Sequence, residues 1–281
     1  MEMHFATIWE SIADAIPEAP AVTHGSCTRT WAEYDQRAAR LTSALADAGL
    51  GPDSKVGLYL YNSNEYLEAQ FAAFKLRGVA INVNYRYLDD ELWYLLDNSD
   101  AEALFFHASL GDRVARVIER LPKLKLLVEV DDGPAGQVDG AVPYEQLIGA
   151  HDAAPRVIRG EDDIYMLYTG GTTGMPKGVM YPMSGITQGF LTIGFPLVGQ
   201  AVPASADAVA PAARAGHEAG AASISIPAAP LMHGTGLWIG ACIPHLTGAH
   251  VVTLTSRSLD ADEVMRTIEQ HRATLLVIVG D

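Results

Sequence analysis

The stretch from Tyr168 to Val179 combines glycines, threonines and one lysine in a pattern suited to holding a polyphosphate. Its sequence is Tyr-Thr-Gly-Gly-Thr-Thr-Gly-Met-Pro-Lys-Gly-Val. Glycines allow positive φ and bring backbone N–H groups close to an anion, threonine hydroxyls donate further hydrogen bonds, and lysine supplies compact positive charge. The apolar run 164–168 predicts a buried strand in front of this stretch, so we expect the loop to leave the end of a sheet, where α/β proteins build their sites.

Two better known phosphate-binding patterns do not fit this loop. The Walker A pattern requires Gly-x-x-x-x-Gly-Lys-Ser/Thr, whereas here Pro176 precedes Lys177 and Gly178 follows it. The dinucleotide pattern Gly-x-Gly-x-x-Gly is also missing, which leaves a Rossmann oxidoreductase with little support. A Gly/Thr-rich surface turn between two strands is the alternative interpretation, and the specific order of hydroxyls, proline and lysine argues against it.

The loop resembles the phosphate-binding loop of the adenylate-forming enzymes, the superfamily of acyl-CoA synthetases, firefly-luciferase-like enzymes and peptide-synthetase adenylation domains. Three further stretches resemble family segments in the same order, so the resemblance covers essentially the whole chain: Thr30–Tyr34, Phe74–Arg86 and Pro230–Leu237. One departure follows Val179, where the family often carries Ser/Thr-His and this chain has Met180-Tyr181. The contact that the family histidine makes is therefore not expected here.

The resemblance implies ATP-dependent activation of a carboxylic acid, a fatty or other apolar acid, to an acyl-adenylate, followed by thioester formation with CoA. Charge that builds on the phosphate oxygens as pyrophosphate leaves would be stabilised by the loop. The resemblance assigns catalytic roles to Thr169, Lys177 and His233, and Mg²⁺ is expected with ATP. The expected nucleotide-binding groups are Thr169, Gly170, Gly171, Thr172, Thr173, Gly174 and Lys177.

His233 stands between apolar residues and glycines, a setting that by itself is more typical of a packed core histidine. Its place inside the family motif implies instead that it lies where the acyl pocket meets the nucleotide, with Gly234 and Trp238 as further substrate-binding residues. We do not interpret it as a general base, because an ionised carboxylate needs no proton removed before it attacks. Phe190 and Phe195 could line an acyl tunnel or belong to the core.

Several parts of the family machinery do not occur between Met1 and Asp281. These are the Tyr-Gly-x-Thr-Glu motif for adenine and magnesium, the ribose-binding Asp, the hinge and the carboxy-terminal catalytic Lys. We interpret the chain as the amino-terminal region of a longer enzyme, with little activity alone and with the magnesium ligand beyond Asp281. Two alternatives stay open: an acyl-AMP ligase that loads a carrier protein, and a non-catalytic nucleotide- or acyl-binding module.

Composition limits the remaining function classes. The 281 residues are 49% hydrophobic, enough for a sizeable core, and the net charge of -15 argues against a nucleic-acid partner. Cys27 and Cys242 form no disulfide framework, the histidines show no metal-ligand spacing, and a reducing, cytosolic setting is expected. No apolar run reaches the ~18 residues of a membrane span. Peripheral lipid contact and the oligomeric state are left open.

Strands that alternate with helices predict an α/β fold with mostly parallel sheets covered by helices, and the resemblance implies the layered αβαβα amino-terminal large domain of the family. We expect one AMP-binding domain over 1–281, with a first βα unit over about 1–135, a phosphate-loop unit over 136–281 and an Ala-rich insertion at 201–222. That insertion is expected to bury little surface and to be a mobile loop or a lid. The expected helices are 5–16, 31–49, 65–76, 89–96, 110–121 and 261–271. The expected strands are 55–60, 79–83, 103–106, 124–130, 164–168, 223–227, 251–254 and 274–279.

Overall fold

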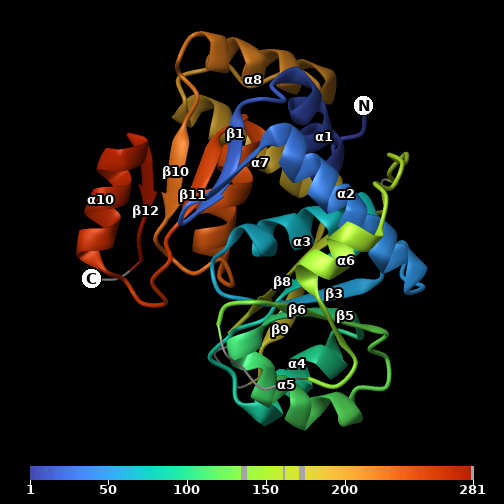
Figure 1. Cartoon of the computed structure of the whole chain (residues 1–281). Helices are drawn as coiled ribbons and strands as arrows, with labels where there is room; N and C mark the ends of the chain where they lie inside the picture. The colour runs from blue at the N-terminus through green and yellow to red at the C-terminus, as the bar shows by residue number, and fades with distance from the viewer. Residues whose placement is uncertain (134–137, 161, 171–174, 280–281) are drawn as a thin grey trace.

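The computed structural model describes residues 1–133, 138–160, 162–170 and 175–279, and it contains three sheets within these ranges (Figure 1). The helices are α1 Phe5–Ala15, α2 Trp31–Asp47, α3 Asn64–Lys75, α4 Asp89–Asn98, α5 Gly111–Val117, α6 Tyr144–Ala150, α7 Met183–Leu197, α8 Val209–Glu218, the π-helix η4 Thr235–Cys242, α9 Ile243–Leu246 and α10 Ala261–His271. The strands are β1 Pro20–His24, β2 Cys27–Thr30, β3 Lys55–Tyr59, β4 Val79–Asn82, β5 Ala101–His107, β6 Leu126–Val130, β7 Ala141–Pro143, β8 Ile164–Thr169, β9 Lys177–Pro182, β10 Ile224–Pro227, β11 His250–Thr253 and β12 Leu275–Val277.

The two larger sheets are mainly parallel. One has the order β4-β3-β5-β6-β7 and is parallel throughout. The other has the order β12-β10-β11-β1-β2 and is parallel except for the β1–β2 hairpin. The first 135 residues thus contribute strands to both sheets, and β7 pairs with β6 across the predicted division near residue 135. That division of the chain stays a prediction.

Helices separate the sheets and cover their outer faces. Because strand side chains alternate between faces, Val56 and Leu58 of β3 join the core shared with α1, α2 and α3, while Tyr59 joins the core beneath α4 and α5. On the other sheet, Val252 packs with Val264 of α10. The result is a stack of helix, sheet, helix, sheet and helix, visible in Figure 1. The α/β fold class and the layered arrangement are confirmed.

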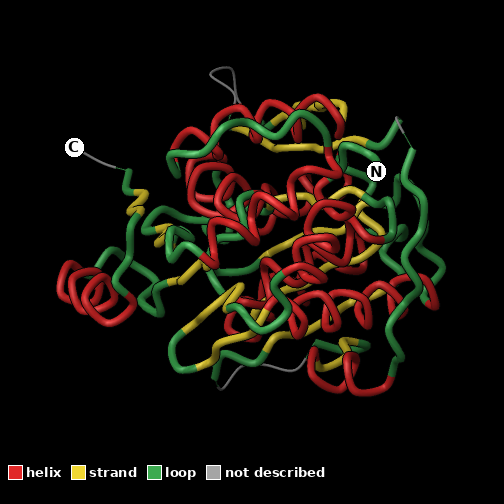
Figure 2. Tube along the Cα trace, turned by 90° about the horizontal axis from the view of Figure 1, so that it is seen from above, coloured by secondary structure: helices red, strands yellow, loops and turns green. Residues whose placement is uncertain are grey.

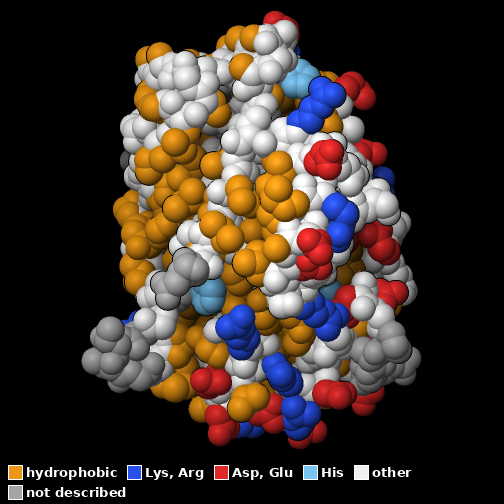
Figure 3. Space-filling model, turned by 90° about the vertical axis from the view of Figure 1, so that its left-hand side faces the viewer, with side chains coloured by type: hydrophobic (Ala, Val, Ile, Leu, Met, Phe, Trp, Pro, Cys, Tyr) orange, Lys and Arg blue, Asp and Glu red, His pale blue; other side chains and the backbone are white. Residues whose placement is uncertain are grey.

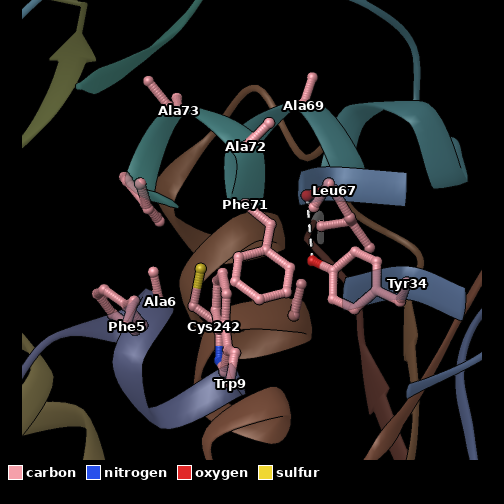
Figure 4. Packing of buried hydrophobic residues seen from close by; sticks show 14 of the residues in the cluster. Phe5, Ala6, Trp9, Tyr34, Leu67, Ala69, Phe71, Ala72, Ala73 and Cys242 are labelled. Carbon is pink, nitrogen blue, oxygen red and sulfur yellow. Dashed lines mark hydrogen bonds between the residues drawn. The ribbon is translucent and has the colours of Figure 1, made fainter. Parts of the chain in front are cut away.

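The middle layer holds the most densely aromatic part of the core, shown in Figure 4. The rings of Phe5 and Phe71 lie 5.3 and 5.2 Å from the ring of Trp9, and all three side chains are fully buried. Tyr34 donates its hydroxyl hydrogen to the backbone oxygen of Leu67 at 3.0 Å, so the polar end of this buried ring is satisfied. These contacts fix α1, α2 and α3 against one another between the sheets.

Local sequence sets where the middle helices begin and end. The Thr30 hydroxyl accepts a hydrogen bond from the Glu33 N–H, and the Glu33 carboxylate accepts one from the Thr30 N–H, which confirms the predicted start of α2. After α3, Arg77 adopts φ 63° and the chain turns at Gly78. A Cβ at Gly78 would lie 2.9 Å from the Ser54 oxygen, so the close approach that starts β4 needs glycine there.

A buried ion network ties the approach to β8 onto the middle helices. Glu10 of α1 accepts from Lys75 at 2.8 Å and from Arg159 at 2.7 and 2.8 Å, with all three side chains about 5% exposed. Asp163 accepts from Arg77 at 2.8 Å and stands next to the first residue of β8. Buried charges need such pairing, and here the pairing fixes where β8 begins.

The Ala-rich segment 201–222 differs from expectation. Val209 to Glu218 form α8, which packs on α1, with Val209, Ala210 and Ala213 buried. Arg214 also donates through Nε to the Ala15 oxygen at 2.9 Å, at the carboxyl end of α1. Small side chains allow the two helices to approach closely, although most residues of the segment are exposed. Whether it also acts as a lid stays a prediction.

Several elements besides α8 were not predicted, among them the β1–β2 hairpin, β7, α6, β9, α7, η4 and α9. The predicted strand at 274–279 is also shorter, since β12 spans Leu275–Val277. In the described part of the chain β12 is an edge strand of its sheet, and it lies with α10 at one side of the molecule (Figure 2). Figure 3 shows hydrophobic side chains gathered over this side. Among the described residues, no helix is both long enough and apolar enough to cross a bilayer.

Candidate functional site

The predicted phosphate loop connects two antiparallel strands. β8 ends at Thr169 and β9 begins at Lys177, and these two residues are direct partners in the ladder. The loop thus leaves the end of a strand, as expected, but the sheet is the two-stranded antiparallel β8–β9 pair and not one of the two larger sheets. Gly178 makes this pairing possible, since a Cβ there would lie 2.8 Å from Met166 Sδ and 2.9 Å from the Tyr168 ring.

The described ends of the loop are exposed to solvent, so a ligand could reach them. Thr169, Gly170 and Lys177 are exposed. Side chains of directly opposed residues stand on the same face of an antiparallel pair, so the hydroxyl of Thr169 and the ammonium of Lys177 share one face at the mouth of the hairpin. The other expected phosphate ligands lie outside the described residues: Gly171, Thr172, Thr173 and Gly174.

His233 and Gly234 lie in the turn between β10 and η4. The His233 N–H donates to the Pro230 oxygen at 3.1 Å, and η4 starts at Thr235. A Cβ at Gly236 would lie 2.3 Å from the Pro230 oxygen and 2.7 Å from the Ala229 oxygen, so only glycine lets the helix begin against this turn. A π-helix is rare in proteins and is often found at functional sites.

The His233 side chain is exposed, and its pKa is lowered by partial burial of the ring and by the nearby positive charge of Arg86. The imidazole is consequently neutral around pH 7, with one nitrogen that donates and one that accepts. A neutral ring can hydrogen-bond to a carboxylate or phosphate oxygen, and it brings no fixed positive charge. The positive charge of the site is therefore left to Lys177 and Arg86.

A cleft of about 250 Å³ joins the loop to the His233 turn. It is lined on one side by Tyr168, Gly170 and Pro176, and on the other by His233. Asn82, at the end of β4, lies between them: its Nδ2 donates to the Tyr168 oxygen at 2.9 Å and to the Met232 oxygen at 2.7 Å. The structure thus brings together two motifs that are more than 50 residues apart in the chain.

Trp238 of η4 forms an aromatic wall beyond this cleft. Its Nε1 donates to the hydroxyl oxygen of the buried Tyr165 at 2.9 Å, and its ring lies 5.6 Å from that of Tyr181 and 5.5 Å from that of Phe190. The indole itself is half-buried, so part of it faces outward. Phe195 is fully buried in the core, and its alternative role as a tunnel residue is not supported.

The sequence analysis missed Asn82 and Asn62, which hold the turn from both sides. Asn62 donates to the oxygens of Pro227 and Ala229 and accepts from the Leu231 N–H. A polar asparagine at the end of the otherwise apolar strand 79–82 was the available signal for Asn82. No comparable signal marked Asn62, because it follows its strand in a loop.

In the ranges that the structure describes, no group of three or more His, Cys, Asp and Glu side chains is placed to hold a metal ion. Cys27 and Cys242 are both free thiols. Burial raises the pKa of the Cys242 thiol, and the sulfur donates weakly to Gln70 Oε1 at 3.8 Å, so this cysteine is an inert core residue.

The fold is an α/β domain whose cleft lies beside the predicted phosphate loop and near the aromatic wall around Trp238. The chain belongs to the AMP-binding enzyme family, whose profile matches residues 9–281.

Two relatives are similar along the chain. It is 37% identical to the medium-chain acyl-CoA ligase Mig of Mycobacterium avium, over 97% of this chain and 51% of that protein. It is 36% identical to the 3-oxocholest-4-en-26-oate–CoA ligase of Rhodococcus rhodochrous, over 100% of this chain and 50% of that protein. The chain therefore spans about half the length of the curated relatives it matches.

Solved structures share the fold. The anthranilate CoA ligase AuaEII in complex with anthranoyl-AMP superposes with a TM-score of 0.80 at 21% identity, over 97% of this chain and 49% of that one. A putative long-chain-fatty-acid CoA ligase from Rhodopseudomonas palustris superposes with a TM-score of 0.75 at 23% identity, over 97% of this chain and 62% of that one. These similarities extend to the whole layered arrangement.

Proposed function

We propose that the protein to which this chain belongs activates a carboxylic acid with ATP and transfers the acyl group to CoA, as an acid–thiol ligase that forms AMP. The observation that supports the proposal is the cleft lined by Gly170 and His233, in which the described end of the proposed phosphate loop lies next to the proposed acyl-site turn. Membership in the AMP-binding family and the names of the relatives support the same reaction class.

In the first step, a carboxylate oxygen attacks the α-phosphorus of ATP, and the bond to pyrophosphate breaks. Lys177 and the Thr169 hydroxyl face the same side at the hairpin mouth, where they can stabilise the charge on the departing phosphates. The loop residues Gly170, Gly171, Thr172, Thr173 and Gly174 are proposed to add backbone and hydroxyl donors. A Mg²⁺ ion bound to ATP would neutralise part of the phosphate charge in this step.

His233 is proposed to orient the acid, because its neutral ring can donate one hydrogen bond to the carboxylate or to the acyl phosphate. No proton must be removed from an ionised carboxylate, so a base is not required in this step. In the second step, the sulfur of CoA attacks the acyl carbon, the acyl–phosphate bond breaks and AMP leaves. The thiol loses its proton in that step.

An apolar acid is the proposed substrate class. Trp238, Tyr181 and Phe190 form an aromatic wall next to Gly234 and His233, and such a wall favours a hydrocarbon group over a polar one. The relatives' names specify medium-chain and steroid acids for those proteins. We propose a fatty or other apolar acid and a role in lipid metabolism, in a reducing, cytosolic compartment that suits free cysteines.

Two other functions remain as candidates. An acyl-AMP ligase would perform the first step and transfer the acyl group to a carrier protein, which an assay of acyl acceptors distinguishes from CoA transfer. A non-catalytic nucleotide- or acyl-binding module would bind without turnover. The chain spans about half the length of its relatives, and the family motifs for adenine, ribose and the carboxy-terminal lysine do not occur in this sequence. The choice among the three functions therefore depends on turnover assays.

Carboxylate-dependent exchange of labelled pyrophosphate into ATP tests the proposal. It should be run on this chain and on the longest open reading frame of the gene, with acids of different length. We expect exchange by the longer form and little or none by the 281-residue chain. No exchange by a folded longer form would support the binding module, and exchange without CoA thioester would support the acyl-AMP ligase.

A further inference from the structure

Asn82 stands at the junction of three segments that are distant in sequence. It is the last residue of β4, and its side chain is 7% exposed. The amide oxygen accepts from the Tyr168 N–H at 2.7 Å, and the amide nitrogen donates to the Tyr168 oxygen at 2.9 Å. The side chain therefore binds both backbone groups of the residue that precedes Thr169.

The second hydrogen of the same nitrogen points the other way, to the Met232 oxygen at 2.7 Å. Met232 precedes His233 and is itself buried. One carboxamide thus fixes the start of the phosphate loop relative to the turn that carries His233. The carboxamide of asparagine carries one oxygen that accepts hydrogen bonds and one nitrogen that donates two, all in one rigid plane. It can therefore bind three backbone groups at once.

We propose that Asn82 is a positioning residue for the reaction. It holds the phosphate loop and the His233 turn at a fixed distance from each other, and it acts through these two segments without binding a substrate. The inference rests on the proposed function for its catalytic consequence. Without Asn82, the phosphate loop and the His233 turn keep their own ligand-binding groups. The distance between the loop and the turn is then no longer fixed. A displacement of about 1 Å between reacting groups can cost on the order of 100-fold in rate.

Asn62 provides a matched control. It also makes three hydrogen bonds, to the oxygens of Pro227 and Ala229 at 3.3 and 3.1 Å and from the Leu231 N–H at 2.8 Å. All three partners lie between the end of β10 and His233, and none belongs to β8. Asn62→Leu and Asn82→Leu each replace a carboxamide by an apolar group of similar size and remove the same number of hydrogen bonds, but only Asn82→Leu disconnects the phosphate loop.

The first test uses the 281-residue chain without ligand and measures amide hydrogen exchange. In Asn82→Leu, exchange should rise about tenfold both at residues 166–170 and at residues 230–235. In Asn62→Leu it should rise only at residues 227–235, with residues 166–170 unchanged. Peptides from α2 serve as the reference for global stability. A rise confined to one segment in Asn82→Leu, or an equal rise at 166–170 in both variants, would overturn the joining role.

The second test measures pyrophosphate exchange by the longest form of the protein. Asn82→Leu should lower kcat about tenfold or more while each KM, for ATP and for the acid, changes less than about threefold. Asn62→Leu loosens only the turn and leaves β8 in place, so it should lower kcat clearly less than Asn82→Leu does. Equal kcat in the two variants, or a loss that lies in KM alone, would count against positioning. If the unmodified protein shows no exchange, the proposed function fails, and the hydrogen-exchange result still decides the joining role.

Discussion

Thr169 and Lys177 are direct partners at the open end of the β8–β9 hairpin, so the first hydroxyl and the only lysine of the phosphate loop share one face although seven residues separate them in the chain. The loop between them is thereby closed at its base by backbone pairing. A ligand on that face meets a compact positive charge and a hydroxyl donor together. This arrangement makes Lys177 the first residue to test.

Lys177→Ala in the longest form of the protein should slow adenylation ~100-fold, because a preorganised donor to the departing pyrophosphate is lost. The thiol-transfer half reaction, started from the acyl-adenylate, should change much less. Both steps can be followed separately by pyrophosphate exchange and by thioester formation. Lys123→Ala is the control, since Lys123 is exposed and precedes β6, which belongs to a different sheet from the β8–β9 hairpin. Equal slowing of both half reactions would refute the assigned role.

Trp238→Ala should shift the preferred acid toward longer or bulkier chains, because the aromatic wall beside His233 is removed. Selectivity between neighbouring chain lengths, measured as a ratio of kcat/KM values, should change about tenfold. Tyr165→Phe should give a smaller shift in the same direction, since it removes the hydroxyl that accepts from the Trp238 indole. An unchanged chain-length profile in Trp238→Ala would place the acyl site elsewhere.

Gly236→Ala should lower the free energy of unfolding by about 1–3 kcal/mol, since overpacking carries a cost of this size. The new Cβ would lie 2.3 Å from the Pro230 oxygen, so η4 must move away from the His233 turn. Urea unfolding of the 281-residue chain measures the change. Gly149→Ala is the matched control, because a Cβ at Gly149 in α6 meets nothing within 4 Å and alanine favours a helix. A stable Gly236→Ala variant with unchanged unfolding would disprove the packing argument.

His245 should make the chain less stable in acid. Complete burial lowers the pKa of its imidazole to about 4, while an unfolded histidine titrates near 6.5. Between these values the unfolded chain binds a proton that the folded chain does not, so stability is present above pH 6.5 and falls as the pH drops toward 4. His245→Gln should flatten the dependence of Tm on pH in this window, and His217→Gln, at an exposed position, should not. Identical slopes in both variants would contradict this assignment.

Much of the fold could be predicted from the sequence because its signals are local. Apolar periodicity, the Thr30–Glu33 capping box and the order of strands and helices depend on residues within one or two turns of each other. These signals predicted the α/β class and the boundaries of α2, α3 and α10 closely. They failed where tertiary packing decides: α8 forms because small alanines fit against α1, and β9 forms because Gly178 fits beneath Met166 and Tyr168.

The sequence by itself predicted the chemistry that we propose, since the residue types of the loop suit a polyphosphate and the His233 turn lies in a stretch that resembles the family's acyl-site motif. Only the tertiary structure decided how these groups meet. The pairing of Thr169 with Lys177 and the bridge from Tyr168 through Asn82 to Met232 join residues up to 150 positions apart. No local pattern encodes such contacts, because they follow from the stacking of two sheets around a shared core.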